Sequence, residues 1–207
     1  MMRGVWVKVC GITSVEQALF CVEIGVDAVG VNFVPSSPRH VDREQASEIA
    51  RAVGQRAVVV GVVADMEAGE LRSLRAQTAI RWLQLCGNEP PELLTEVGPE
   101  AYKAVRIGSA EDVALAASFA GDRVLVDTKV EGALGGTGQS FDWSLVQKLA
   151  RERRIVLAGG LRPENVAQAI AAVRPFGVDV ASGVERAPGD KDFDAVRCFV
   201  ENARRAA

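Results

Sequence analysis

The 207-residue sequence predicts a single-domain α/β protein, a (βα)8 barrel of the TIM type that spans residues 1–207. Three observations predict this fold. Eight short apolar runs rich in Val and Ile have the length of strands, amphipathic helical patterns lie between them, and the two alternate about once per βα unit. Continuously apolar strands that alternate with helices form buried parallel sheets. The length favours one large domain over two small ones.

The eight predicted strands occupy residues 5–10, 28–34, 57–63, 80–85, 102–107, 123–127, 154–158 and 177–180. Their first residues are separated by 23, 29, 23, 22, 21, 31 and 23 positions, which leaves room for one helix after each strand. A doubly wound parallel sheet is the structural alternative. It would more usually stop at about five to seven strands, so eight units favour the closed barrel.

The predicted helices are recognised by apolar residues at positions i, i+3, i+4 and i+7, which share one helical face. Four clear examples begin at Val15, Ala46, Val166 and Val196. Thr13 and Glu16 have the spacing of a capping box ahead of the first helix, and Pro163 stands where a later helix should start. These helices are expected to cover a flat apolar surface, the outside of the barrel.

Composition and charge exclude several classes of protein. The 48% apolar and 25% charged content exclude a disordered tail, a collagen-like repeat and a coiled-coil rod. No apolar stretch approaches the length of a membrane span, and the first eight residues lack the apolar core of a secretory signal, so we expect a cytoplasmic protein that does not bind membranes. The net charge of −3 and the scattered Lys and Arg make nucleic acid an unfavoured partner.

Cysteine and histidine usage limits the chemistry. Cys10, Cys21, Cys86 and Cys198 lack the close spacing of a zinc or redox motif, so reduced thiols and no metal site are expected. His40 is the only histidine, and it would have to serve alone in a catalytic triad or a multi-histidine metal site. We expect His40 at the surface, and proton transfer by carboxylates, thiols or lysines.

Polar residues gather at the carboxyl ends of the predicted strands, where barrels of this type carry their chemistry. The strand ends and the positions just after them hold Cys10, Asp65, Cys86, Arg106, Asp127, Gly159, Gly160, Ser182 and Gly183. Interior strand positions are mostly apolar. The sequence therefore predicts a functional site at one rim of the barrel.

Two further features of the rim follow from strand geometry. Side chains alternate along a strand, so Lys8 shares a face with Cys10, and Asp179 on the neighbouring last strand is a candidate ion-pair partner for Lys8. A lysine that extends to the rim is the alternative. The Gly-rich loop at residues 128–141 is a candidate lid over the site, or else a tolerated insertion.

The turns after the seventh and eighth predicted strands contain Gly159, Gly160 and Gly183, with Ser182 beside the last. Glycine allows backbone amides to approach an anion closely, and phosphate sites of (βα)8 barrels lie in this region. A single Gly-Gly pair is weak evidence because glycine also serves plain turns. A second such turn on the adjacent strand strengthens the case for a phosphate site.

Eight sequence blocks, in order and spread over almost the whole chain, resemble the phosphoribosylanthranilate isomerase family. They are KVCGIT (8–13), NFVPSSPRHV (32–41), VGVVAD (60–65), LQLCG (83–87), VLVDTK (124–129), GGTGQSFDW (135–143), LAGGLRPENV (157–166) and VDVASGVERAPGDKD (178–192). The resemblance implies a barrel enzyme of tryptophan biosynthesis. It would catalyse the Amadori rearrangement of N-(5′-phosphoribosyl)anthranilate to 1-(2-carboxyphenylamino)-1-deoxyribulose 5-phosphate, by acid–base chemistry without cofactor or metal.

The resemblance also implies roles for individual residues. Cys10 corresponds to the general base of the family, Asp127 to its general acid, and Arg39 to the residue that holds the anthranilate carboxylate. The phosphate site corresponds to Gly159 and Gly160 together with Ser182 and Gly183. Cys86 departs from the pattern because the family usually has histidine there, which leaves its role open.

The implied reaction requires particular protonation states of Cys10 and Asp127. An ordinary thiol is mostly protonated and an ordinary carboxyl mostly ionised at neutral pH, so Cys10 needs a nearby cation such as Lys8, and Asp127 needs a raised pKa.

Two alternative functions remain open. Another sugar-phosphate barrel, such as indole-glycerol-phosphate synthase or an isomerase with a second aldose substrate, is the enzymatic alternative. A phosphate-ligand sensor on an inactive barrel is the non-enzymatic one. Whether the protein is a monomer or a homodimer is not evident from the sequence.

Overall fold

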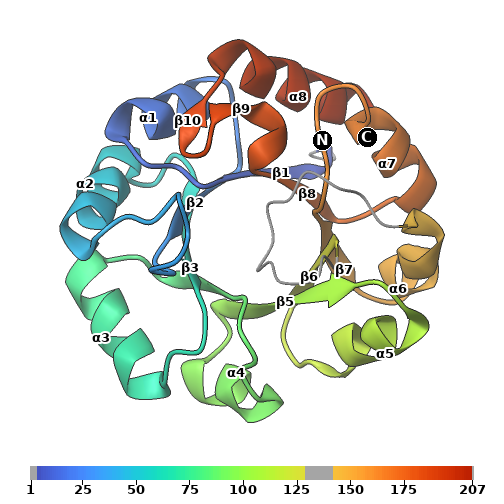
Figure 1. Ribbon diagram of the computed structural model, residues 1–207, viewed down its shortest axis with the longest axis horizontal. Coiled ribbons are helices and arrows are strands. Elements are labelled where there is room, and N and C mark those ends of the chain that lie inside the picture. Colours follow the sequence, from blue (N-terminus) through green and yellow to red (C-terminus); the bar gives the residue numbers. More distant parts are fainter. Residues whose placement is uncertain (1–3, 129–141, 207) are drawn as a thin grey trace.

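The computed structural model describes residues 4–128 and 142–206, and its strands form one closed parallel barrel in the order β1 to β8 (Figure 1). The strands are β1 (Trp6–Cys10), β2 (Ala28–Asn32), β3 (Val58–Val63), β4 (Trp82–Leu85), β5 (Ala101–Ile107), β6 (Arg123–Thr128), β7 (Arg154–Leu157) and β8 (Gly177–Val180). β8 pairs with β1 and closes the ring. This confirms the predicted (βα)8 barrel and rules out the doubly wound sheet, which stays open.

The helices form a ring outside the strands in Figure 1. They are α1 (Val15–Glu23), α2 (Arg43–Val53), α3 (Ala68–Thr78), α4 (Pro91–Val97), α5 (Ala110–Ser118), α6 (Gln147–Glu152), α7 (Val166–Val173) and α8 (Phe193–Arg205). Two 3₁₀ turns, η1 (Trp143–Val146) and η2 (Ser182–Val184), and a small hairpin of β9 (Glu185–Ala187) and β10 (Asp190–Lys191) complete the described part. Within it, no helix has the length and apolar character needed to cross a membrane.

The start of α1 differs from the predicted capping box. Ser14, not Thr13, is the N-cap residue, and its hydroxyl accepts a hydrogen bond from the Gln17 amide at 3.2 Å. Gln17 in turn accepts one from the Thr13 amide at 3.1 Å. The Ser-x-x-Gln spacing satisfies the exposed amides as well as Thr-x-x-Glu would, which is why the sequence alone placed the cap one residue early.

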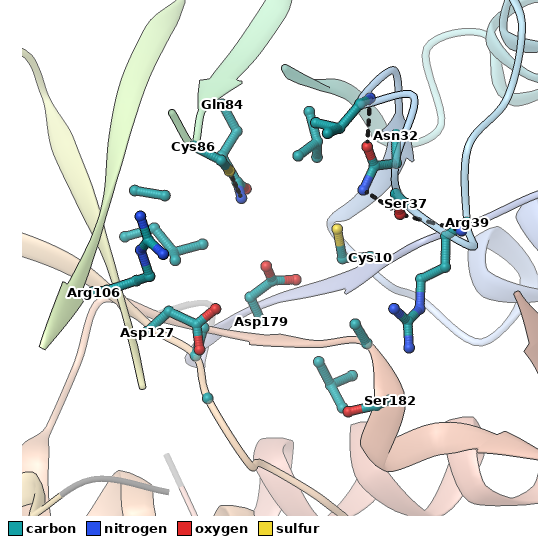
Figure 2. A pocket seen from close by; sticks show the side chains of 18 of the residues that line it. Cys10, Asn32, Ser37, Arg39, Gln84, Cys86, Arg106, Asp127, Asp179 and Ser182 are labelled. Carbon is teal, nitrogen blue, oxygen red and sulfur yellow. Dashed lines mark hydrogen bonds between the residues drawn. The ribbon is translucent and has the colours of Figure 1, made fainter. Parts of the chain in front are cut away.

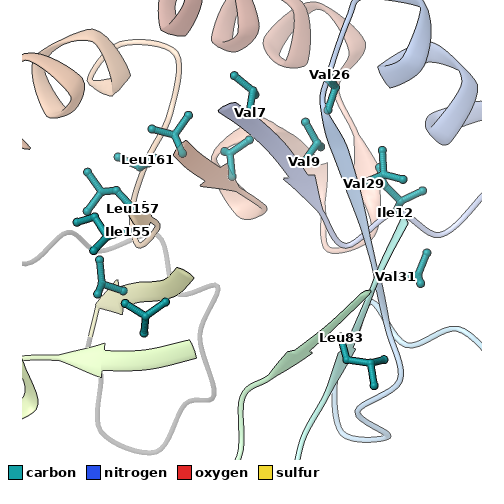
Figure 3. Packing of buried hydrophobic residues seen from close by; sticks show 14 of the residues in the cluster. Val7, Val9, Ile12, Val26, Val29, Val31, Leu83, Ile155, Leu157 and Leu161 are labelled. Atoms are coloured by element: carbon teal, nitrogen blue, oxygen red, sulfur yellow. The ribbon is translucent and has the colours of Figure 1, made fainter. Parts of the chain in front are cut away.

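Two apolar layers hold the barrel together. The larger fills the space between strands and helices, where side chains such as Val7, Val9 and Val29 point outward from the strands (Figure 3). The smaller lies inside the barrel and is built from Ala28, Val60, Tyr102, Leu125, Val156 and Ala158. Because successive strand residues point to opposite sides, one strand serves both layers.

The amino-terminal end of the barrel is closed by a cation among aromatic rings. The Arg123 guanidinium lies 4.6 Å from the ring centre of Trp82, 5.1 Å from that of Phe176 and 5.5 Å from that of Trp6. Asp122 balances its charge at 2.9 Å. With this end sealed, the cavity of the barrel opens at the carboxyl ends of the strands.

Candidate active site

A cavity of about 420 Å³ opens at the carboxyl ends of the strands (Figure 2). Its wall includes all but one of the predicted site residues: Cys10, Arg39, Asp127, Gly159, Gly160 and Ser182. These residues come from strands or loops on several sides of the barrel and meet only because the sheet closes. Gly183 is not part of the wall and acts one layer behind it.

Lys8 and Asp179 form the predicted ion pair inside the barrel. They are register partners on β1 and β8, and Lys8 Nζ lies 2.7 Å from Asp179 Oδ2. The lysine side chain is fully enclosed and the aspartate side chain is 7% exposed. A side chain at Gly30 on β2 would bring a Cβ within 2.7 Å of Cys10 Sγ and 3.1 Å of Lys8 Nζ, so glycine there makes room for both. The alternative of a lysine extending to the rim is wrong.

The Cys10 thiol, at the end of β1, is buried and faces the cavity. Burial raises its pKa above the usual value, although the charge of Lys8 acts in the opposite direction. The negative charge of Asp179 adds to the rise. Because Asp179 neutralises Lys8, the lysine does not make Cys10 a thiolate in the resting site, and another positive charge must assist its ionisation.

The Asp127 carboxyl, near the end of β6, has the raised pKa that an acid requires. Burial raises its pKa to about 6 against the hydrogen bond from the Thr128 amide, and the charge of Asp179 adds to the rise. The amide donates to Asp127 Oδ1 at 2.7 Å. With a pKa near 6, about 9% of such a carboxyl is protonated at pH 7, compared with about 0.1% for an ordinary aspartate.

Arg39 lies at the opposite side of the cavity from Asp127 in Figure 2 and belongs to a network of charges. Its Nε and Nη2 donate to both oxygens of Glu185, at 2.9 and 2.6 Å. Lys191 holds the same carboxylate at 2.7 Å. Gly11, with φ of +77°, lies directly beneath the Arg39 side chain, where a Cβ would collide with its Cδ. The guanidinium is therefore held in place at the edge of the cavity.

Two glycine turns line the cavity beside β7 and β8. Gly159 and Gly160 have φ of +86° and +63°, a backbone region that glycine adopts without strain. A Cβ on Gly159 would collide with Thr128 and approach Asp127 Oδ1 to 2.7 Å. A Cβ on Gly183 would collide with the Leu161 carbonyl, so this glycine allows the two turns to pack side by side.

The remaining rim residues divide into two groups. Cys86 and Arg106 line the cavity, and the Cys86 sulfur accepts a hydrogen bond from Gln84 at 3.2 Å. Asp65 instead accepts a hydrogen bond from the Asn88 amide and joins the loops after β3 and β4, away from the cavity wall. His40 is exposed, as expected.

Sequence reasoning missed the residues that support Arg39. Glu185 and Lys191 lie within the last family-like block, but no role was predicted for either. The Glu185 side chain is 4% exposed and the Lys191 side chain 1%, and charges buried to this extent require a partner. Asn32 was also missed: its amide donates to Ser37 Oγ at 3.1 Å, and that hydroxyl accepts from the Arg39 amide. The only signal in the sequence was that Asn32 is a polar residue in the same block as Arg39, and that Glu185 and Lys191 are charged residues in the last block.

Two further expectations from the sequence are the candidate lid and the lack of a metal site. The candidate lid, residues 128–141, lies outside the described residues except for Thr128. Over residues 4–128 and 142–206, no group of three or more His, Cys, Asp or Glu side chains is arranged to hold a metal ion. All four cysteines are free thiols.

Comparisons with known proteins agree with the blocks quoted above. The family model of N-(5′-phosphoribosyl)anthranilate (PRA) isomerase matches residues 7–202. An N-(5′-phosphoribosyl)anthranilate isomerase of Myxococcus xanthus is 44% identical over 205 residues, which cover 97% of each chain.

Solved structures agree as well. A structure described as monomers of the dimeric phosphoribosylanthranilate isomerase of Thermotoga maritima superimposes with a TM-score of 0.87 at 39% identity, covering 97% of this chain and 99% of that one. A second, in complex with reduced 1-(o-carboxyphenylamino)-1-deoxyribulose 5-phosphate, gives a TM-score of 0.85 at 38% identity with the same coverage. The chain therefore belongs to the N-(5′-phosphoribosyl)anthranilate isomerase family.

Proposed function

We propose that Cys10 and Asp127 carry out the isomerase reaction of the family in this chain. The chain catalyses the Amadori rearrangement of N-(5′-phosphoribosyl)anthranilate in tryptophan biosynthesis. In the proposed mechanism, Asp127 is the general acid and Cys10 the general base. The observation that carries this assignment is one cavity that holds both a carboxyl with a pKa raised to about 6 and a buried thiol.

The steps follow from the charges. Protonated Asp127 gives its proton to the ring oxygen of the ribose, the C1′–O bond breaks, and the nitrogen lone pair forms an iminium cation. The cation acidifies the proton on C2′, and the Cys10 thiolate removes it to give a neutral enolamine that tautomerises to the ketone. Because the pKa of Cys10 is raised in the resting site, the positive charge of the iminium is what favours its thiolate.

Substrate recognition is assigned to the two sides of the cavity. Arg39 binds the anthranilate carboxylate, since a guanidinium recognises a carboxylate by paired hydrogen bonds. Gly159, Gly160 and Ser182 form the phosphate site at the turns after β7 and β8, and Gly183, behind the cavity wall, supports it by allowing the two turns to pack together. The close packing of these turns supports this assignment, because it allows backbone amides to approach an anion.

We infer a phosphorylated small molecule as the partner, as in the relative bound to a reduced phosphate product analogue. A homodimer is one option, because the Thermotoga maritima relative is described as dimeric, and a monomer is the other. The cytoplasm is the proposed location.

The test is direct turnover. Wild-type protein mixed with enzymatically generated phosphoribosylanthranilate should remove the fluorescence of that substrate, and Cys10→Ala and Asp127→Asn should each slow this loss by at least about 10²-fold. A wild-type protein without turnover would instead favour the phosphate-ligand sensor on an inactive barrel. The paired acid and base argue against the sensor, which requires neither.

A further inference from the structure

The Asp179 carboxylate lies between the two proton-transferring groups in the cavity. Figure 2 shows it between Asp127 and Cys10, and its strand β8 is paired with the β1 strand that carries Cys10. Asp179 contributes to the cavity wall, whereas its partner Lys8 is fully enclosed behind it. The ion pair therefore turns its negative end toward the cavity.

One oxygen of this carboxylate lacks a partner. Oδ2 accepts from Lys8 at 2.7 Å, but the buried Oδ1 has no hydrogen-bond partner among the described residues. The neighbouring Val180 amide favours the charged form of the carboxylate without forming a hydrogen bond of normal geometry. The hydroxyl of Tyr102, a second donor inside the barrel, is used by Gln84 at 3.0 Å. Buried carboxylate oxygens are normally bonded, so Asp179 is suited to receive another donor.

The chemistry of the proposed function indicates which donor this is. Asp127 acts on the ring oxygen at C1′, and Cys10 acts on the hydrogen of C2′. A group between them faces the C1′–C2′ edge of the sugar, which carries one hydroxyl, on C2′. The tetrahedral C2′ points its hydrogen and its hydroxyl in different directions, matching the neighbouring strands that carry Cys10 and Asp179.

We propose that Asp179 is a third functional carboxylate, which accepts a hydrogen bond from the 2′-hydroxyl of the ribose and so holds the C2′ hydrogen against Cys10. The inference rests on the proposed function and adds a residue to it. Burial raises the pKa of Asp179, and the charge and hydrogen bond of Lys8 act in the opposite direction, toward the carboxylate. Lys8 also fixes the orientation of Asp179, so Lys8 is a positioning residue. The negative end of the pair also faces the iminium cation that forms when the ring opens.

Asp179 also acts on the acid. Its charge raises the pKa of Asp127, whereas Lys8 on β1 and Arg106 on β5 lower it, as does the Thr128 amide. Neutralising Asp179 therefore lowers the pKa of Asp127. The alkaline limb of kcat, which reports loss of the Asp127 proton, should move to lower pH.

The experiment compares Asp179→Asn with a matched control. Asp179→Asn should lower kcat about 10- to 100-fold, the range for loss of a hydrogen bond to a charged group, with a smaller effect on KM and an alkaline limb at lower pH. Glu89→Gln neutralises the carboxylate of another buried lysine pair, Lys103 with Glu89, whose side chains are 6% and 3% exposed and do not line the cavity. It should lower stability and leave kcat and the alkaline limb unchanged.

A second variant covers the case in which Asp179→Asn leaves Lys8 unpaired and does not fold. Lys8→Met with Asp179→Leu replaces the pair by apolar side chains, an exchange that buried ion pairs often tolerate. A purely structural pair predicts normal kcat in this double variant, whereas the proposal predicts a loss of at least about 10-fold.

A third measurement needs no variant. In a crystal structure of the wild-type protein with the reduced product analogue, O2′ should lie within about 3.2 Å of an Asp179 carboxylate oxygen. An O2′ bonded elsewhere, or folded Asp179 variants with normal kcat and an unmoved alkaline limb, would overturn the inference. Those outcomes leave wild-type turnover intact, whereas failure of the proposed function would abolish it.

Discussion

Each end of the barrel has an arginine near an aspartate, but the two aspartates differ: the Asp122 side chain at the amino-terminal end is 44% exposed, whereas Asp127 lies in the cavity wall at the carboxyl-terminal mouth. At the amino-terminal end, the Arg123 guanidinium lies over aromatic rings and pairs with Asp122 at 2.9 Å. Burial raises the pKa of Asp122, but Arg123 and Arg154 together outweigh it and hold the pKa below its usual value. At the carboxyl-terminal mouth, Asp127 has a pKa raised to about 6, and burial outweighs the neighbouring Arg106.

The difference shows where this fold stabilises itself and where it keeps reactive groups. At the closed end, Arg123 and Asp122 form an ion pair, and this pairing stabilises both charges. Charges at the mouth include a carboxyl kept partly protonated and an Asp179 oxygen that has no hydrogen-bond partner within residues 4–128 and 142–206, and both cost stability. We expect substitutions at the mouth to affect activity and those at the closed end to affect stability.

The largest effect is expected for Asp127→Asn. It removes the proposed proton donor while keeping the shape of the side chain, so kcat should fall by about 10²- to 10⁴-fold, the range for loss of general acid catalysis. Steady-state fluorescence assays measure this loss. A folded Asp127→Asn variant with near-normal kcat would show that another group is the acid.

The same variant should not lose stability, and the pH dependence has a defined sign. The folded pKa of Asp127, about 6, lies above its unfolded value, so the folded state binds more protons between about pH 4 and 6. Wild-type stability therefore falls as pH rises through this window, by up to about 3 kcal/mol. Asp127→Asn lacks this loss. Chemical unfolding at pH 4 and pH 7 should show its advantage over wild type only at the higher pH.

Arg123→Met tests the closed end and should give the opposite pattern. It removes cation–π contacts with Trp6, Trp82 and Phe176, and we expect a loss of about 2–3 kcal/mol, or a fall in Tm of about 5–10 °C. kcat should stay within about threefold of wild type, since the guanidinium lies at the end remote from the cavity. Thermal unfolding and turnover on one preparation measure both. A large fall in kcat without a fall in Tm would contradict the division between the two ends.

Arg39→Lys should have the smallest effect. Lysine keeps the charge but not the paired hydrogen bonds that Arg39 makes with Glu185 and is proposed to make with the anthranilate carboxylate. KM should rise about tenfold with kcat within about threefold of wild type, the pattern for loss of uniform binding. Titration of initial rates against substrate separates the two. An unchanged KM would remove Arg39 from substrate binding.

The fold was predictable because each element carries its own signal. The apolar run at residues 154–158 and the pattern from Val166 to Val173 show strand and helix without reference to the rest of the chain. The Lys8–Asp179 pair was also predictable, since strand alternation and barrel closure fix both residues. The Ser14 cap was not, because Thr13 and Ser14 offer similar hydroxyls and only the backbone decides between them.

The site was predictable in part. Cys10, Arg39 and Asp127 were identified through the family-like blocks, and all three line one cavity. Glu185 and Lys191 were not identified, because a charged residue in a loop is usually solvated and nothing local shows that these two are buried together.

The sequence by itself determined the alternation of strands and helices, the glycine positions at the turns and the chemical types at the strand ends, because these depend on local periodicity and side-chain chemistry. The tertiary structure alone decided that burial would raise the pKa of Asp127 to about 6, that Lys8 would serve Asp179 more than Cys10, and that Glu185 would hold Arg39. These properties depend on distance and solvent exclusion between residues far apart in the chain, and both arise only when the barrel closes.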